Sequence, residues 1–149
     1  MKNMFLILSI LTIIYSCNKN DDNQVFPQNK EFDIIYNGAL HGNGKEGITR
    51  SNMIINNSND WENLMSQMNS VNNLSDNFSE TDIDFNDYII IAVFLEVKGH
   101  GWEIEITKIT DNENSLVVST NENEFIYSLM NQPFSIVKTR RTEKTIEFE

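Results

Sequence analysis

The sequence predicts an α+β domain over residues 32–149, mostly antiparallel β-sheet with one amphipathic helix. Three patterns carry the prediction: the apolar run "YIIIAVFLEV" (88–97), the alternating stretch "WEIEI" (102–106) and a helical spacing of apolar residues around Trp61. Strand patterns follow one another in the second half with no helix between them, which favours antiparallel pairing.

The first half begins with "EFDIIY" (31–36), which has the composition of a strand. "NMIIN" (52–56) predicts a short second strand, and the glycine- and asparagine-rich segment "NGALHGNGKEG" (37–47) between them predicts a turn region.

A helix is predicted next. Asn59 followed by Glu62 three residues later fits a capping signature. Apolar side chains then recur at i, i+3, i+4 and i+7, and this spacing places them on one helical face that packs on a sheet. These side chains are Trp61, Leu64, Met65 and Met68. The polar stretch 69–82, with isolated Leu74 and Phe78, predicts the longest and most mobile loop.

The remaining segments read as strands. Residues 88–97 are apolar on both strand faces, as in a central strand covered on both sides. In 102–106, Trp102, Ile104 and Ile106 share one face and Glu103 and Glu105 the other. Further strands are predicted at 115–120, 133–139 and 144–148, the last two joined by the polar turn "RRTE" (140–143).

The N-terminus predicts a lipoprotein signal peptide over residues 1–16. Lys2 precedes an apolar run from Met4 to Tyr15, which is shorter than the roughly 20 residues of a spanning helix. The run stops at Ser16 and Cys17, a pair similar to a bacterial lipobox, so cleavage is expected between them and lipidation at Cys17. Since Cys17 is the single cysteine, the chain can form no internal disulfide. The alternative is an ordinary secretory signal.

Residues 17–31 have the composition of a lipidated, flexible tether. Within it, "KNDD" (19–22) resembles acidic export signals that follow the lipidated cysteine in some bacteria, although two aspartates also suit any solvated tether. The expected location is the bacterial outer membrane, on its periplasmic or its cell-surface side.

The net charge of −11 limits which partners the chain can bind. An acidic surface repels nucleic acid and anionic headgroups, so neither is expected as a partner. Membrane attachment is therefore expected through the N-terminal lipid alone.

His100 lies between two glycines in "KGHGW" (98–102). Gly99 and Gly101 predict a hairpin turn with positive φ that leaves His100 exposed to solvent. A metal ion needs three or four ligands, and His41 is the one other histidine, so no metal site, catalytic residue or cofactor is predicted. "DIDFND" (82–87) lacks the glycine of a calcium loop and predicts a strand entry with outward carboxylates.

A basic cluster interrupts the acidic sequence near the C-terminus. Two interpretations remain open: a charged hairpin end that protects a sheet edge, or a docking point for an acidic partner surface. The cluster consists of Lys138, Arg140, Arg141 and Lys144.

Three segments in order resemble the C-terminal domain of the PrcB-like family, whose namesake is a protease complex subunit. They are the Trp61 helix, "DIDFNDYIIIAVF" (82–94), and "GHGWEIEI" (99–106) followed by "QPFSIVKTRRTEKTIEFE" (132–149). His100 stands where the family usually has a second glycine, and Trp102 replaces a commoner tyrosine. The resemblance covers residues 32–149 and implies a lipid-anchored, non-enzymatic domain that associates with a secreted protease.

The function expected from the sequence is therefore a protein-binding module, a subunit or stabiliser of a secreted or surface complex. Its binding rim is placed at Lys98, Gly99, His100, Gly101 and Trp102, with Trp102 as an anchor. The alternatives are a protease inhibitor that acts through an exposed loop, a structural or adhesive surface lipoprotein, and a hydrolase.

Overall fold

A computed structural model describes residues 25–126 and 130–149. The signal peptide, Cys17 and the first part of the tether lie outside the described residues. Within the described part of the chain, no helix has the length and apolar character needed to cross a membrane.

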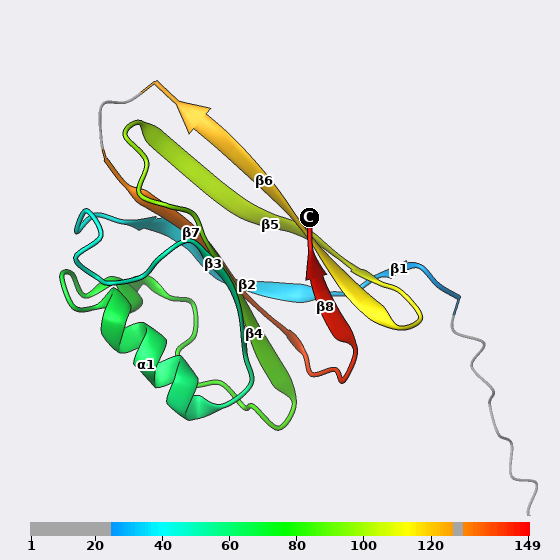
Figure 1. Ribbon diagram of the computed structural model, residues 1–149. Helices are drawn as coiled ribbons and strands as arrows, with labels where there is room; N and C mark the ends of the chain where they lie inside the picture. The colour runs from blue at the N-terminus through cyan, green and yellow to red at the C-terminus, as the bar shows by residue number, and fades with distance from the viewer. Residues whose placement is uncertain (1–24, 127–129) are drawn as a thin grey trace, which may run out of the picture.

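The domain has three layers: helix α1, a four-stranded sheet that it covers, and a second four-stranded sheet behind the first (Figure 1). The first sheet has the order β2-β7-β4-β3 and is antiparallel throughout. The second has the order β1-β5-β6-β8. The elements are β1 (Gln28–Asn29), β2 (Phe32–Leu40), β3 (Ser51–Ile55), α1 (Ser58–Met68), a 3-10 turn (Leu74–Asn77), β4 (Tyr88–Phe94), β5 (Gly101–Asp111), β6 (Ser115–Phe125), β7 (Gln132–Arg140) and β8 (Thr145–Phe148). The predicted α+β class is confirmed.

The helix packs on its sheet through the predicted face. Trp61, Leu64 and Met68 are buried, and the Trp61 Nε1–H donates to the carbonyl oxygen of Thr81 at 2.8 Å. Apolar side chains of β2, β4 and β7 supply most of the rest of this core: Ile35, Leu40, Ile90, Ala92, Phe94, Phe134 and Ile136.

The helix begins earlier than predicted. Asn57, not Asn59, is the N-cap, and its Oδ1 accepts from the Asp60 N–H at 3.0 Å. Asn57 with Asp60 repeats the pattern of Asn59 with Glu62, so the sequence offers two equivalent starts. Tertiary structure chooses between them, because β3 ends at Ile55, which is buried in the core.

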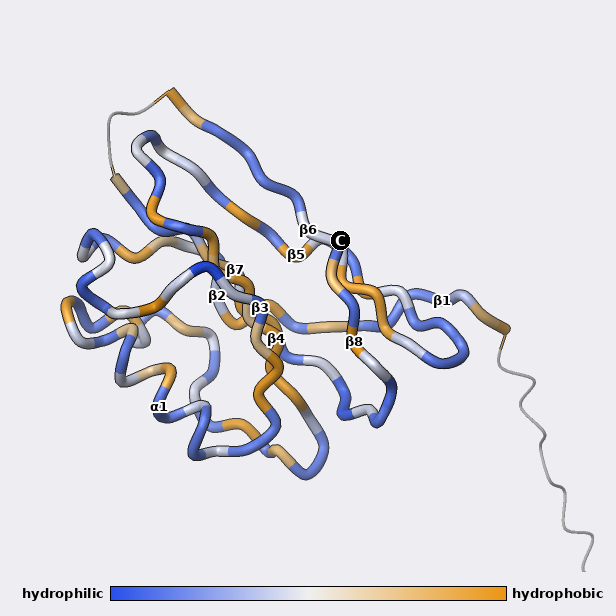
Figure 2. The backbone as a smooth tube through the Cα atoms, in the orientation of Figure 1, coloured by the Kyte–Doolittle hydropathy of each residue, from blue (hydrophilic) through white to orange (hydrophobic). Residues whose placement is uncertain are grey.

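Strand β4 is covered on both faces, as predicted. Its residues alternate between the two cores: Ile90, Ala92 and Phe94 face the helix, whereas Ile91 and Val93 face the second sheet. In Figure 2 the tube is strongly hydrophobic along β4. The core between the sheets is completed by residues of β5, β6, β7 and the segment that follows β4: Leu95, Ile104, Ile106, Ile109, Leu116, Val118 and Val137.

Two predicted hairpins are wrong. β7 and β8 do not pair; the segment at 140–143 carries the chain from one sheet to the other, where β8 pairs in parallel with β6. β4 and β5 likewise lie in different sheets, and the φ of Gly99 is not in the left-handed region. Both connections cross the sandwich because the strands that they join bury side chains in the same inter-sheet core from opposite sides.

The segment predicted to be a tether contributes to the fold. Gln28–Asn29 forms β1, which pairs with Asp111 and Thr110 of β5. An edge strand this short needs only backbone hydrogen bonds, so its polar residues show no apolar alternation that would predict a strand.

The polar stretch 69–82 is anchored rather than free. Phe78 stacks on Trp61 with ring centroids 5.9 Å apart, and the Ser79 N–H donates to the Ile35 carbonyl oxygen at 3.1 Å. The segment predicted as a turn region at 37–47 is strand as far as Leu40. "DIDFND" (82–87) does turn its aspartates outward while Ile83 is buried, but it is a turn that precedes β4.

Candidate binding groove beside Trp102

A groove of about 400 Å³ lies between β2 and the first half of β5. We call it the Trp102 groove. Strand β5 contributes one wall, β2 with the residue that follows it the other, and the residues at the two ends of the segment between β6 and β7 close one end. The lining residues are Asn37, Gly38, Ala39, His41, Gly101, Trp102, Glu103, Ile104, Glu105, Phe125 and Asn131.

The predicted rim lies at the mouth of this groove. Gly101 and Trp102 line it directly, whereas Gly99 and His100 are in the bend that leads into β5. The Lys98 ammonium lies 4.4 Å from the Trp102 ring centroid, a cation–π contact that holds the indole ring in place. Of the five residues grouped from the sequence, Gly101 and Trp102 line the groove.

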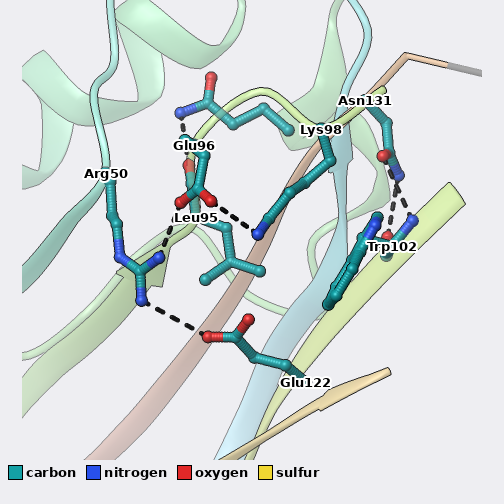
Figure 3. A network of polar contacts seen from close by, with 8 residues as sticks. Arg50, Leu95, Glu96, Lys98, Trp102, Glu122 and Asn131 are labelled. Carbon is teal, nitrogen blue, oxygen red and sulfur yellow. Dashed lines mark hydrogen bonds and ion pairs between the residues drawn. The ribbon is translucent and has the colours of Figure 1, made fainter. Parts of the chain in front are cut away.

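Asn131 fixes the backbone of this rim. Its Nδ2 donates to the Trp102 carbonyl oxygen at 2.9 Å, and its Oδ1 accepts from the Trp102 N–H at 3.4 Å (Figure 3). Its own backbone exchanges hydrogen bonds with Lys98, at 2.8 and 3.2 Å. One side chain and one peptide unit thus join β5, the bend before it and the start of β7.

An ion-pair network supports the rim from the side (Figure 3). Glu96 pairs with Lys98 at 2.6 Å and with Arg50 at 2.8 Å, and Arg50 reaches Glu122 on β6 at 3.5 Å. Hydrogen bonds from Lys98, from the backbone and from Arg50 lower the pKa of Glu96 to about 2. The Lys98 ammonium therefore contacts both a carboxylate and the indole ring, and this restricts its position.

The β5 backbone has an open edge inside the groove. Trp102 turns its N–H and C=O away from β6, toward Asn131, and the Ile106 N–H points the same way, donating to Ser135 Oγ at 3.0 Å. Because the direction alternates along a strand, Ile104 between them also presents its N–H and C=O to the groove. Within the described residues, no strand pairs with this edge of β5 at Ile104, because β1 pairs only with Thr110 and Asp111.

One exposed apolar residue lines the groove, and two more adjoin lining residues in the chain. Phe125, which lines it, is 40% exposed; Ile126 follows in the chain, fully exposed, and Met130, before Asn131, is 53% exposed. Glu103 and Glu105 add negative charge to the same wall. In the described part of the chain, neither carboxylate pairs with a lysine or arginine.

Residues of the predicted basic cluster pair within the chain, and two of them, Lys138 and Arg140, lie over the same Tyr88 ring. Lys138 bonds to Glu80, which raises the pKa of Lys138, and Arg140 pairs with Asp87 at 3.0 Å. Arg141 donates to the carbonyl oxygens of Asn56 and Phe85. Lys144 pairs with Asp111 at 2.5 Å. Their positive charge is largely balanced by these contacts.

The two histidines have different surroundings. His100 is exposed, as predicted, while His41 lines the Trp102 groove. Over residues 25–126 and 130–149, no three His, Cys, Asp or Glu side chains group so as to hold a metal ion.

Sequence reasoning did not find Asn131, Phe125 or the β2 wall at residues 37–39. One signal was available: β6 ends at Phe125 and Ile126 follows it, an apolar pair after the polar run "NENE" (121–124), which is unusual for a strand end facing solvent. The contact between Asn131 and Trp102 spans 29 positions and leaves no local pattern.

Comparison with protein-family models, with curated proteins and with solved structures gave no match.

Proposed function

We propose that the chain is a lipid-anchored, non-enzymatic protein-binding module, a subunit or stabiliser of a secreted or surface complex such as a protease complex. The observation that carries the proposal is the Trp102 groove: an apolar cavity with a tryptophan in its wall, on a domain that is otherwise strongly acidic. The resemblance to the PrcB-like family supports the same role.

The groove has the properties of a protein-binding site. Tryptophan anchors are enriched among the residues that dominate interface energies. Phe125, Ile126 and Met130 expose apolar surface beside it, and contiguous exposed apolar surface is characteristic of interaction sites. Trp102 is already positioned by Lys98 and Asn131, so little ordering is needed when a partner binds.

Affinity capture of the tagged lipoprotein from its own membranes in mild detergent tests the proposal. Phe125→Ser removes apolar surface at the groove; Ile54→Ser is the matched control, because Ile54 on β3 is similarly exposed, at 46% against 40%. We expect a stoichiometric protein that is captured by the wild type and by Ile54→Ser and is lost with Phe125→Ser. Equal capture by all three proteins would contradict the groove as the binding site.

If the captured protein is a protease, its activity with and without the lipoprotein separates two roles. Higher or longer-lived activity in the complex identifies a subunit or stabiliser, and lower activity identifies an inhibitor.

A further inference from the structure

We infer that the Trp102 groove receives an extended segment of the partner protein as an added β-strand on the open edge of β5, and that this segment alternates apolar and basic residues. This inference rests on the proposed function and specifies the mode of recognition.

The backbone of β5 supplies the first reason. Trp102 and Ile106 have their outward N–H groups occupied by Asn131 and Ser135. Ile104 between them directs its N–H and C=O the same way, where no strand lies beside it within the described residues. Ile104 is 3% exposed, and buried backbone groups in proteins are almost always hydrogen-bonded. An extended peptide entering the groove would pair with these two groups, as in other complexes formed by strand addition.

The same edge of β5 already pairs with a strand farther along. Gln28–Asn29 of β1 pairs with Asp111 and Thr110, and the Lys30 N–H donates to the Ile109 carbonyl oxygen at 2.9 Å. Beyond this point the chain leaves β5 for β2, and a register shift between Ile106 and Lys108 interrupts the regular ladder. The unpaired part of the edge therefore continues an existing pairing line toward Trp102.

Side chains along the groove define the sequence of the partner segment. Successive residues of a strand point to opposite faces, so one set would contact Trp102 and the other would pass Glu103 and Glu105. Phe125 pairs with Gly101 and therefore lies on the face of the two glutamates. These two glutamates have no cationic partner among the described residues. Lysine or arginine at alternate positions would complement them.

A second copy of this chain is a poor occupant. Each copy carries a net charge of −11, so two copies would bring acidic surfaces together at the same edge. A basic segment is instead attracted by that charge.

Peptide binding to the full-length lipoprotein in detergent micelles tests the inference by fluorescence anisotropy. The probe is a labelled decapeptide of alternating valine and lysine. Two matched peptides accompany it: one with glutamate in place of lysine, and one N-methylated at two consecutive central residues, which removes a hydrogen-bond donor from each edge. We expect each change to weaken binding by about tenfold or more, since lost hydrogen bonds and lost charge pairing each contribute on that order.

Two pairs of variants locate the site. Ala39→Trp fills the groove from β2 and should abolish binding, whereas Ser66→Trp, on the exposed face of α1, should not change it. Glu103→Lys with Glu105→Lys should reverse the preference toward the glutamate peptide. Glu113→Lys with Glu147→Lys makes the same change of net charge at exposed positions outside the groove and should preserve it.

Hydrogen exchange completes the test. We expect the bound probe to slow exchange of the amides in residues 101–106. Undiminished binding of the N-methylated peptide, or protection confined to another part of the chain, would overturn strand addition. So would a dimer in light scattering that Ala39→Trp dissociates, because the edge would then pair with a second copy.

The two proposals fail differently. If a native partner is captured through Phe125 but residues 101–106 gain no protection in that complex, the binding module stands and strand addition is wrong. If no partner is captured, the proposed function fails whatever the peptides do.

Discussion

The Asn131 side chain hydrogen-bonds both the N–H and the C=O of Trp102, at 3.4 and 2.9 Å, and so takes the place of a neighbouring strand at this point of β5. An amide group can donate and accept at once, which lets one side chain satisfy both backbone groups. The position of Trp102 thus depends on a residue 29 positions away.

Asn131→Ala should loosen the rim. Both backbone groups of Trp102 lose their partner, and we expect faster amide exchange over residues 101–106 together with a loss of about 1–2 kcal/mol in the free energy of unfolding. Hydrogen exchange and urea unfolding measure the two effects. Asn123→Ala is the control, because the Asn123 side chain bonds only to the exposed Glu103 side chain within the described residues; equal effects of the two variants would contradict the role of Asn131.

Ser135 links the two sheets, and Ser135→Ala should destabilise the domain by about 1–3 kcal/mol because it leaves a buried Ile106 N–H without an acceptor. Ser135 Oγ accepts from that N–H at 3.0 Å and donates to Asn37 Oδ1 at 2.7 Å. Ser119→Ala is the control, because the Ser119 hydroxyl donates to an exposed Glu149 carboxylate. Its removal should change the free energy of unfolding in urea only slightly. A similar loss of unfolding free energy in both variants would show that the hydrogen bonds of Ser135 between the sheets stabilise the domain no more than an exposed serine does.

Gly42→Ala should destabilise the loop after β2. A Cβ at Gly42 would clash with Oε1 of Glu46, a side chain that is 4% exposed and accepts from the Gly42 N–H at 2.8 Å. Since the carboxylate must move away from the Gly42 N–H that donates to it, we expect a loss of about 1–3 kcal/mol in thermal or urea unfolding. Gly99→Ala provides the control: a Cβ added at Gly99 would meet no atom within 4 Å, so the stability of this variant should match the wild type.

The Glu96 network should make stability depend on pH in acid. The pKa of Glu96 is lowered from 4.5 to about 2 in the folded chain, so its contribution is complete above pH 4.5 and is lost as the pH falls toward 2. Because Glu96 is 46% exposed, solvent screening limits that contribution to about 1 kcal/mol.

Urea unfolding of the wild type and Glu96→Gln at pH 7 and pH 3 checks this dependence. We expect the variant to be less stable at pH 7 and the difference to shrink at pH 3. Glu113→Gln, in the exposed turn between β5 and β6, serves as the control. If the difference in unfolding free energy between the wild type and Glu96→Gln stays constant with pH, the charge of Glu96 does not contribute to stability.

Cys17→Ser should abolish lipidation and release the protein from the membrane fraction, because a serine offers no thiol for the acyl-glyceryl group. Metabolic labelling with a fatty acid and fractionation of the cells measure both outcomes. A labelled, membrane-bound Cys17→Ser protein would disprove the lipoprotein hypothesis.

Local patterns in the sequence were enough for most elements and for part of the site. The helix at Trp61 and the buried strand 88–94 follow from apolar periodicity, which a short segment carries by itself. The stretch 98–102 is conspicuous in the sequence because glycines flank a histidine next to a tryptophan, and two of its residues, Gly101 and Trp102, line the groove. The exact start of the helix was not determined, since Asn57 and Asn59 offer the same cap.

Only the tertiary structure decided how strands pair. The alternating pattern of β5 states which face is buried but not which strand lies beside it, and the same ambiguity made β7 and β8 look like a hairpin although they belong to different sheets. Short β1 has no side-chain pattern to recognise, because it is held by backbone hydrogen bonds.

The groove also combines features that local sequence determines with features that only the tertiary structure decides. The sequence by itself determined that Trp102 follows a glycine-flanked histidine at the start of an alternating strand. Its wall on β2, the Asn131 contact and the open edge at Ile104 come from residues far apart in the chain, which meet only when the two sheets pack. Such contacts depend on the register and packing of whole strands, and no local stretch of sequence encodes them.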